Sequence, residues 1–154
     1  MLIAIIMALL PSELFAQEKI DYTQLRGKEW VMQVPDGWKM FVSYTYTVDT
    51  CILVAKHLKE RVELKSVYYL SDDWNGTFND TKVGVWSADA GKYLIKKKKN
   101  KDRKVILIDV YEILKLTETD LELRSLESIE LTEGGEELSR QQNNGIGKFK
   151  SKQE

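Results

Sequence analysis

Apolar and polar residues alternate from residue 41 to residue 50, a pattern typical of a β-strand with one buried face. The apolar and aromatic residues of this stretch occupy every second position: Val42, Tyr44, Tyr46 and Val48. Successive side chains of a strand point to opposite faces of its sheet, so we expect these residues to face the core. Residues 61–70 alternate in the same way, and residues 30–34, 51–58 and 91–96 indicate further strands.

The densest apolar stretch, residues 105–116, fills both faces of a predicted strand with aliphatic and aromatic side chains. Only Asp109 and Glu112 interrupt this pattern, one on each face. Residues 117–120 (TETD) suit a turn, because short oxygen-bearing side chains bond back to the backbone. Residues 121–124 then alternate like a half-exposed strand. Two strands of this kind are not stable alone in water, so we expect other strands to cover them.

The spacing of these segments indicates one all-β domain over residues 17–131. Asp21 is suited to cap a short helical turn over the four residues that follow it, and residues 128–131 are a last strand candidate. About seven or eight strands at roughly ten-residue spacing, with scarcely any helix, indicate an antiparallel barrel or sandwich. Residues 132–154 hold few apolar residues and no period, which predicts a flexible tail.

The first 16 residues have the pattern of a secretory signal peptide. Residues 2–10 form an unbroken apolar run that is too short to cross a bilayer, and Ala16 offers a small residue for cleavage. The alternative is a buried N-terminal helix. The signal-peptide interpretation predicts a secreted or periplasmic protein that begins at Gln17 and has no stable membrane insertion after cleavage.

Composition adds a neutral charge balance and a single thiol. The 154-residue chain carries 23 basic and 24 acidic residues, and removal of residues 1–16 takes away only one acid, Glu13. The remaining chain is neutral, so its overall charge does not steer it toward nucleic acid or an anionic membrane. Cys51 is the only cysteine, so no intrachain disulfide forms and the fold must rest on its core.

Several short stretches carry a resemblance to a known family: residues 25–30 (LRGKEW), 69–72 (YLSD), 83–84 (VG), 91–95 (GKYLI), 111–113 (YEI), 116–117 (LT) and 121–123 (LEL). Together they make residues 25–131 resemble the lipocalin-like domains of secreted bacterial proteins. The resemblance implies an up-and-down barrel in which Trp30 closes one end. It also implies that a late basic residue, for which Arg124 is the candidate, packs over that tryptophan.

Tyrosines dominate the faces that we assign to the barrel interior. They are Tyr44, Tyr46, Tyr68, Tyr93 and Tyr111. An eight-stranded barrel is wide enough either to be packed solid or to hold one small ligand. Because tyrosine combines apolar area with a hydroxyl, these side chains are either ligand-binding residues or ordinary core residues. Trp86 joins the ligand-binding candidates, since the long stretch 71–90 suggests a lid over the barrel mouth.

The residues that enzymes and metal sites require are scarce. His57 is the only histidine, and Cys51 lies six residues away, beyond hydrogen-bond reach along one strand. One histidine and one cysteine do not fill a zinc site, and the acidic residues 72–80 lack the spacing of a calcium loop. We therefore predict no enzyme activity, no cofactor and no metal.

The basic run 96–104 reads as a solvated hairpin tip, with binding of an acidic glycan or lipid head group as the alternative. No aromatic residue interrupts the run, which argues against nucleic-acid binding. Two functions remain. The first is a lipocalin-like binder of a small apolar or amphipathic ligand. The alternative is a solid-cored β interaction module that binds a protein or a glycan and has no ligand cavity.

Overall fold

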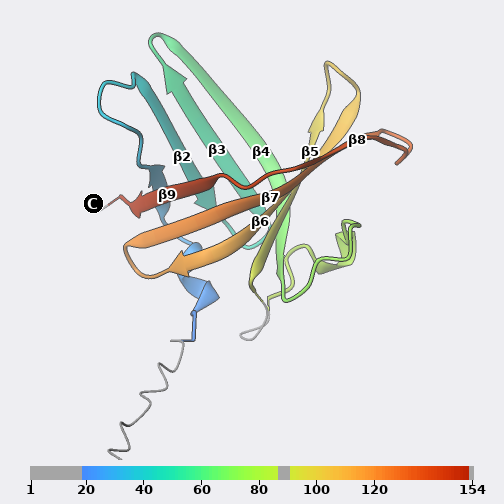
Figure 1. Ribbon diagram of the computed structural model, residues 1–154, viewed down its shortest axis with the longest axis horizontal. Coiled ribbons are helices and arrows are strands. Elements are labelled where there is room, and N and C mark those ends of the chain that lie inside the picture. The colour runs from blue at the N-terminus through green and yellow to red at the C-terminus, as the bar shows by residue number, and fades with distance from the viewer. Residues whose placement is uncertain (1–18, 87–90, 153–154) are drawn as a thin grey trace, which may run out of the picture.

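The computed structural model describes residues 19–86 and 91–152, which form strands joined by turns and two short 3-10 helices. The predicted signal peptide, residues 1–16, lies outside the described residues. In chain order the elements are η1 (Tyr22–Leu25), β1 (Glu29–Met32), β2 (Met40–Tyr46), β3 (Thr50–His57), β4 (Glu60–Ser71), η2 (Asp80–Lys82), β5 (Tyr93–Asn100), β6 (Val105–Leu116), β7 (Asp120–Thr132), β8 (Glu137–Gln142) and β9 (Ile146–Ser151) (Figure 1).

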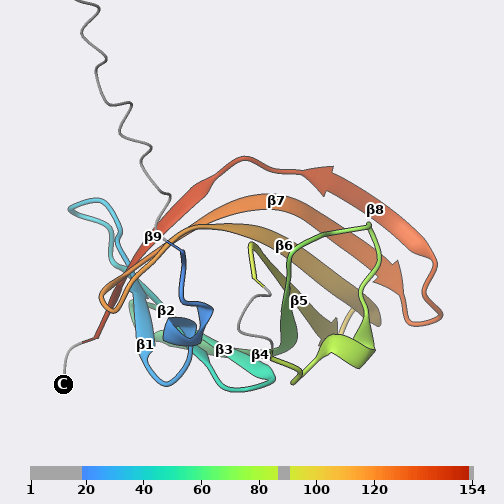
Figure 2. The ribbon, with the colours of Figure 1, turned by 90° about the horizontal axis from the view of Figure 1, so that it is seen from below.

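The strands close into an antiparallel up-and-down barrel. Strands β1 to β7 pair in sequence order, β7 also pairs with β9, and β9 returns to β1. Figure 2 shows β6, β7 and β9 arching over one side, with β1 to β4 forming the other. Strand β8 is an extra strand on the edge of β7. This closed eight-stranded ring confirms the predicted all-β barrel and is consistent with a calycin-like fold.

Strand β7 replaces two predicted strands. Residues 121–124 and 128–131 belong to the single strand Asp120–Thr132, which pairs with β6 along its length. The register shifts opposite Val110 and Tyr111, so a bulge accommodates the polar residues that had suggested an interruption. The other edge of β7 pairs first with β9 and then with β8, so one long strand supports three neighbours.

The prediction of a flexible tail over residues 132–154 is wrong for residues 137–151, because both β8 and β9 lie there. Strand β9 is held mainly by backbone pairing, with β1 on one side and β7 on the other. Phe149 is its only buried residue. The other residues of β9 are exposed or half-buried and mostly polar, so its composition gave no strand signal.

Strand β6 is apolar on both faces because both faces are covered. Its inner face joins the core inside the barrel through Ile113 and Leu116, whereas Ile108 and Val110 belong to a second cluster on the outer face. The described part of the loop after β4 covers that outer cluster with three side chains: Trp74, Phe78 and Val83. The loop therefore packs beside the barrel wall, and the two-faced apolar pattern of β6 reflects two cores rather than one.

Candidate functional site

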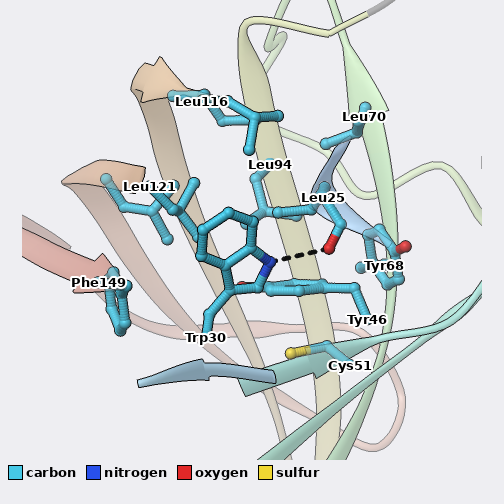
Figure 3. Close-up of a cluster of buried hydrophobic side chains, with 12 residues drawn as sticks. Leu25, Trp30, Tyr46, Cys51, Tyr68, Leu70, Leu94, Leu116, Leu121 and Phe149 are labelled. Atoms are coloured by element: carbon cyan, nitrogen blue, oxygen red, sulfur yellow. Dashed lines mark hydrogen bonds between the residues drawn. The ribbon is translucent and has the colours of Figure 1, made fainter. Parts of the chain in front are cut away.

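The two ends of the barrel differ. The turns at residues 33–39, 58–59, 101–104 and 133–136 share one end, here called the open end. The opposite, closed end holds η1 and the turns at residues 47–49 and 117–119. At the closed end Trp30 is fully buried, and its indole nitrogen donates a hydrogen bond of 2.9 Å to the carbonyl of Leu25 (Figure 3). Trp30 thus occupies the place that the resemblance implied.

Arg124 does not pack over this tryptophan. Its guanidinium pairs with the Glu112 carboxylate at 3.2 Å, and these two residues are direct cross-strand partners on β7 and β6. The cation beside the Trp30 ring is the Lys28 ammonium, 5.3 Å from the ring centroid. The same ammonium donates hydrogen bonds to the Gln24 side chain and to the Glu118 carbonyl.

Four of the predicted site tyrosines come together inside the barrel: Tyr44, Tyr46, Tyr68 and Tyr111. Three of them belong to a ladder of aromatic rings that crosses the interior. Ring centroids are 5.5 Å apart for Phe149 and Tyr44, 6.1 Å for Tyr44 and Tyr46, and 5.3 Å for Tyr46 and Tyr68. The ladder lies in the half of the barrel that is nearer the closed end.

Trp86 extends this ladder at the closed end. Its ring meets Tyr68 edge-to-face with centroids 6.1 Å apart, and the Arg26 guanidinium stacks on it at 3.9 Å. The indole nitrogen also donates to the carbonyl of Val48, which lies in the turn between β2 and β3. The proposed lid over the mouth is therefore wrong for the described loop residues: Trp86 seals the closed end, and Trp74 packs on the outer wall.

Tyr93 lies outside the barrel, which corrects the prediction that it faces the interior. It packs against the outer cluster, because Leu94, its neighbour on β5, takes the inward position opposite Leu70. The strand predicted over residues 91–96 begins at Tyr93, and Leu94 takes the inward position in place of Tyr93 and Ile95. The same phase puts Lys96 inward, a residue that had been assigned to a solvated hairpin tip.

Lys96 is the least expected residue of the interior, with only 5% of its surface exposed. Its ammonium lies 3.9 Å from the ring centroid of Tyr44, 4.8 Å from that of Tyr111 and 5.3 Å from that of Tyr46. The side chain thus crosses from β5 to β2, and three electron-rich ring faces surround it. Burial lowers the pKa of Lys96, because desolvation disfavours its charged form.

A polar row lies beside Lys96 on the same side of the barrel. Asp109 is the direct partner of Lys96 on β6, and Ser128 is the next partner on β7. The Ser128 hydroxyl donates to Asp109 Oδ1 at 3.0 Å and accepts a hydrogen bond of 3.0 Å from the Asn143 amide. The Lys98 ammonium lies 4.0 Å from Asp109 Oδ2. This row runs from Lys96 across the neighbouring strands β6 and β7.

The hydroxyl and thiol groups around Lys96 are held in their protonated forms. Burial raises the pKa of Tyr44 to about 12 and raises the pKa of Tyr46 well above its usual value. Burial also raises the pKa of the Cys51 thiol, although the nearby Lys96 charge opposes this effect. Among the described residues, the buried Tyr46 hydroxyl meets only the weakly polar Cys51 thiol. These groups are suited to donate hydrogen bonds to an acceptor and are poorly suited to act as nucleophiles.

Between Lys96 and the open end, the inward apolar side chains of β4 remain exposed to solvent. Leu64 pairs with Leu53 and Val62 with Ala55, and these positions share the inward face of Tyr68. Tyr68 is fully buried, whereas Leu64 is 39% and Val62 is 50% exposed. The inner face of β4 is thus covered toward the closed end and uncovered toward the open end.

The barrel wall is interrupted between β4 and β5. Their pairing ends at Val67 and Lys97, beyond which the β3–β4 and β5–β6 hairpins diverge (Figure 1). A groove of about 470 Å³, here called the slit, lies at this point. Its lining includes four lysines and no acidic residue: Thr50, Lys65, Ser66, Val67, Lys97, Lys98, Lys99 and Ile106. Of this lining only Ser66 and Lys98 face inward; the other six residues lie on the outward face of their strands, so the slit opens on the outer side of the wall.

Sequence reasoning missed Lys96 and Lys98, although a signal existed. Continuing the alternation from Leu94 along β5 places both lysines on the inward face. Within residues 19–86 and 91–152, no three histidine, cysteine or acidic side chains are grouped to hold a metal ion. The same described ranges contain no helix long and apolar enough to span a membrane.

Comparison with known proteins leaves the fold and the site as the basis for function. No protein-family model, no curated protein and no solved structure matches this chain.

Proposed function

We propose that the protein binds a small apolar or amphipathic molecule in the open half of its barrel. The observation that carries this proposal is the exposure of inward-facing apolar side chains. Leu64 and Val62 are 39% and 50% exposed on the same face of β4 on which Tyr68 is fully buried. A solid-cored barrel would cover these residues, whereas a barrel that receives an apolar ligand leaves them free in the unbound state.

The slit supports this proposal as a route for the ligand. Its volume of about 470 Å³ falls in the range of small-molecule sites, roughly 300–1,000 Å³. Val67 and Ile106 supply apolar surface at its edge. A second groove, of about 500 Å³, lies on the outer side of the closed end and includes Lys19 and Glu112. We place no ligand there, because Lys19 directly follows residues that the structure does not describe.

The proposed role is binding without chemical conversion of the ligand. His57 is exposed at the end of β3, and the tyrosines and the thiol around Lys96 are protonated. In the described interior the Cys51 thiol lies beside the Lys96 amine, but burial raises the pKa of that thiol and so disfavours the thiolate that would act as a nucleophile.

Saturable binding of 1-decanol, followed by isothermal titration calorimetry, is the expected result for the folded protein. Leu64→Lys should weaken this binding about tenfold or more, because it places a charge on the apolar inward face. Glu63→Lys is the matched control: Glu63 is the exposed neighbour on the opposite face of β4 and should leave the affinity unchanged. Absence of saturable binding, or equal affinity for Leu64→Lys and the parent protein, would favour the interaction-module alternative.

We further propose that the protein acts outside the cytoplasm, since the apolar run at residues 2–10 has the length of a signal-peptide core. Exported protein should begin at Gln17 when its N-terminus is sequenced by mass spectrometry. Replacing Ala16 with Lys should block this cleavage, because the site requires a small residue. Protein that is exported yet still begins at Met1 would contradict the signal-peptide assignment.

A further inference from the structure

We infer that the ligand carries an acidic head group, which lies between Lys96 and Lys98 while the apolar chain extends along the inner face of β4. This inference rests on the proposed function and deepens it by naming the chemical class of the ligand. It begins from the charges that face the interior of the open half.

These interior charges do not balance. Lys96 and Lys98 both face inward from β5, and Asp109 is the carboxylate beside them on β6. Glu130 follows on the inward face of β7, but Arg103 already neutralises it at 2.8 Å. Within the described residues, two lysines therefore share one carboxylate, and the Lys98 ammonium is 4.0 Å from it. One positive charge remains without a counter-charge.

Lys96 carries most of this imbalance. Its ammonium lies over the rings of Tyr44, Tyr46 and Tyr111, which attract a cation but supply no full negative charge. In the part of the chain that the structure describes, no ion pair joins Lys96 to an acid. Burial disfavours the charged form of Lys96, and the Asp109 and Cys51 side chains oppose this effect only in part, so an anion beside the amine would hold it in its protonated form.

The uncharged groups around Lys96 favour an acceptor as well. Within the described residues the buried Tyr46 hydroxyl meets only the Cys51 thiol beside it on β3, and that thiol also interacts with Lys96. Both groups remain protonated, because burial raises the pKa of each. A carboxylate offers up to four acceptor positions, so it can receive a hydrogen bond from the phenol and from Lys96 together.

The slit provides an approach with matching charge. Four of its lining residues are lysines and none is acidic. Lys97 and Lys99 are paired with Asp80 and Glu133, which lie outside the lining. Lys65 adds a positive charge on the β4 side. Three of the four lysines are thus paired with acids, and Lys65 supplies the positive charge that would attract the head group of an acidic ligand to this opening.

A matched pair of ligands tests this inference separately from the proposed function. Decanoate and 1-decanol share a chain length and differ in the head group. By calorimetry at pH 7, decanoate should bind the protein about tenfold or more tightly than decanol. Lys96→Met should remove this preference while leaving the affinity for decanol within about twofold. Lys59→Met, at the exposed turn between β3 and β4, should keep the full preference.

Each outcome decides between the two claims. Equal, saturable binding of decanoate and decanol would overturn the acidic-ligand inference and leave the proposed function standing. A preference for decanoate that survives in Lys96→Met would also overturn it. If neither ligand binds, both claims fail together. Lys98→Met, which removes the more exposed interior lysine, gives an independent measurement should Lys96→Met not fold, and it should reduce the preference.

Discussion

A chain that ends at Asn144 should show no cooperative unfolding, because it lacks the strand that closes the barrel. Strand β9 pairs with β1 through Trp30 to Met32 and with β7 through Asp120 to Arg124. Without it, both neighbouring strands gain an unpaired edge, and the buried Trp30 and Leu121 become accessible to water. The expected loss exceeds the whole stability of a typical domain, about 5–15 kcal/mol.

The measurement is thermal unfolding followed by near-ultraviolet circular dichroism, which reports ordered packing of the aromatic ladder. A chain that ends at Lys152 is the matched control, since it keeps β9 and the hydrogen bond from the Lys152 amide to the Glu29 carbonyl. We expect this control to melt cooperatively. A sharp transition in the chain that ends at Asn144 would show that β9 is dispensable.

Replacing Trp30 with Ala should lower the free energy of unfolding by about 3–5 kcal/mol, as expected for truncation of a fully buried tryptophan. The change removes ring packing at the closed end and leaves the Leu25 carbonyl without its indole donor. Urea unfolding measures the difference. Trp38, which is 60% exposed between β1 and β2, provides the control, and Trp38→Ala should change stability by no more than about 0.5 kcal/mol.

A loss below about 1 kcal/mol for Trp30→Ala would mean that the closed end does not depend on this side chain. It would also weaken the comparison between the closed and open halves, since the proposed ligand site requires that only the open half is uncovered. The two stability experiments thus test the closed barrel on which the proposed ligand site depends.

Much of the barrel could be predicted from side-chain periodicity. Val42, Tyr44 and Tyr46 alternate with polar residues because one face of β2 meets the core, and the structure confirms that arrangement. The all-β class followed from the spacing of such strands. The unusual pattern of β6, apolar on both faces, also signalled a second covered face, although it did not identify the loop with Trp74 as the cover.

The remainder depended on pairing and phase, which composition does not reveal. Strand β9 is stabilised by backbone hydrogen bonds on both edges, so Phe149 is sufficient as its buried anchor. The inward position of Lys96 follows from the pairing of Leu94 with Leu70, and a run of four lysines hides that alternation. The lysines of this run suggested exposure to solvent, but the alternation of side chains along β5 places Lys96 in the interior.

The contact between β1 and β9 has a consequence for the speed of folding. It joins Trp30 to Ser151, residues that lie near opposite ends of the described chain. Contacts between distant segments form slowly, because a long loop loses entropy before any pairing repays it. Strands β1 to β7 can pair in chain order, yet the ring stays open until β9 pairs with β1. An open sheet with two unpaired edges therefore precedes the closed barrel, and such edges can pair with other chains before closure.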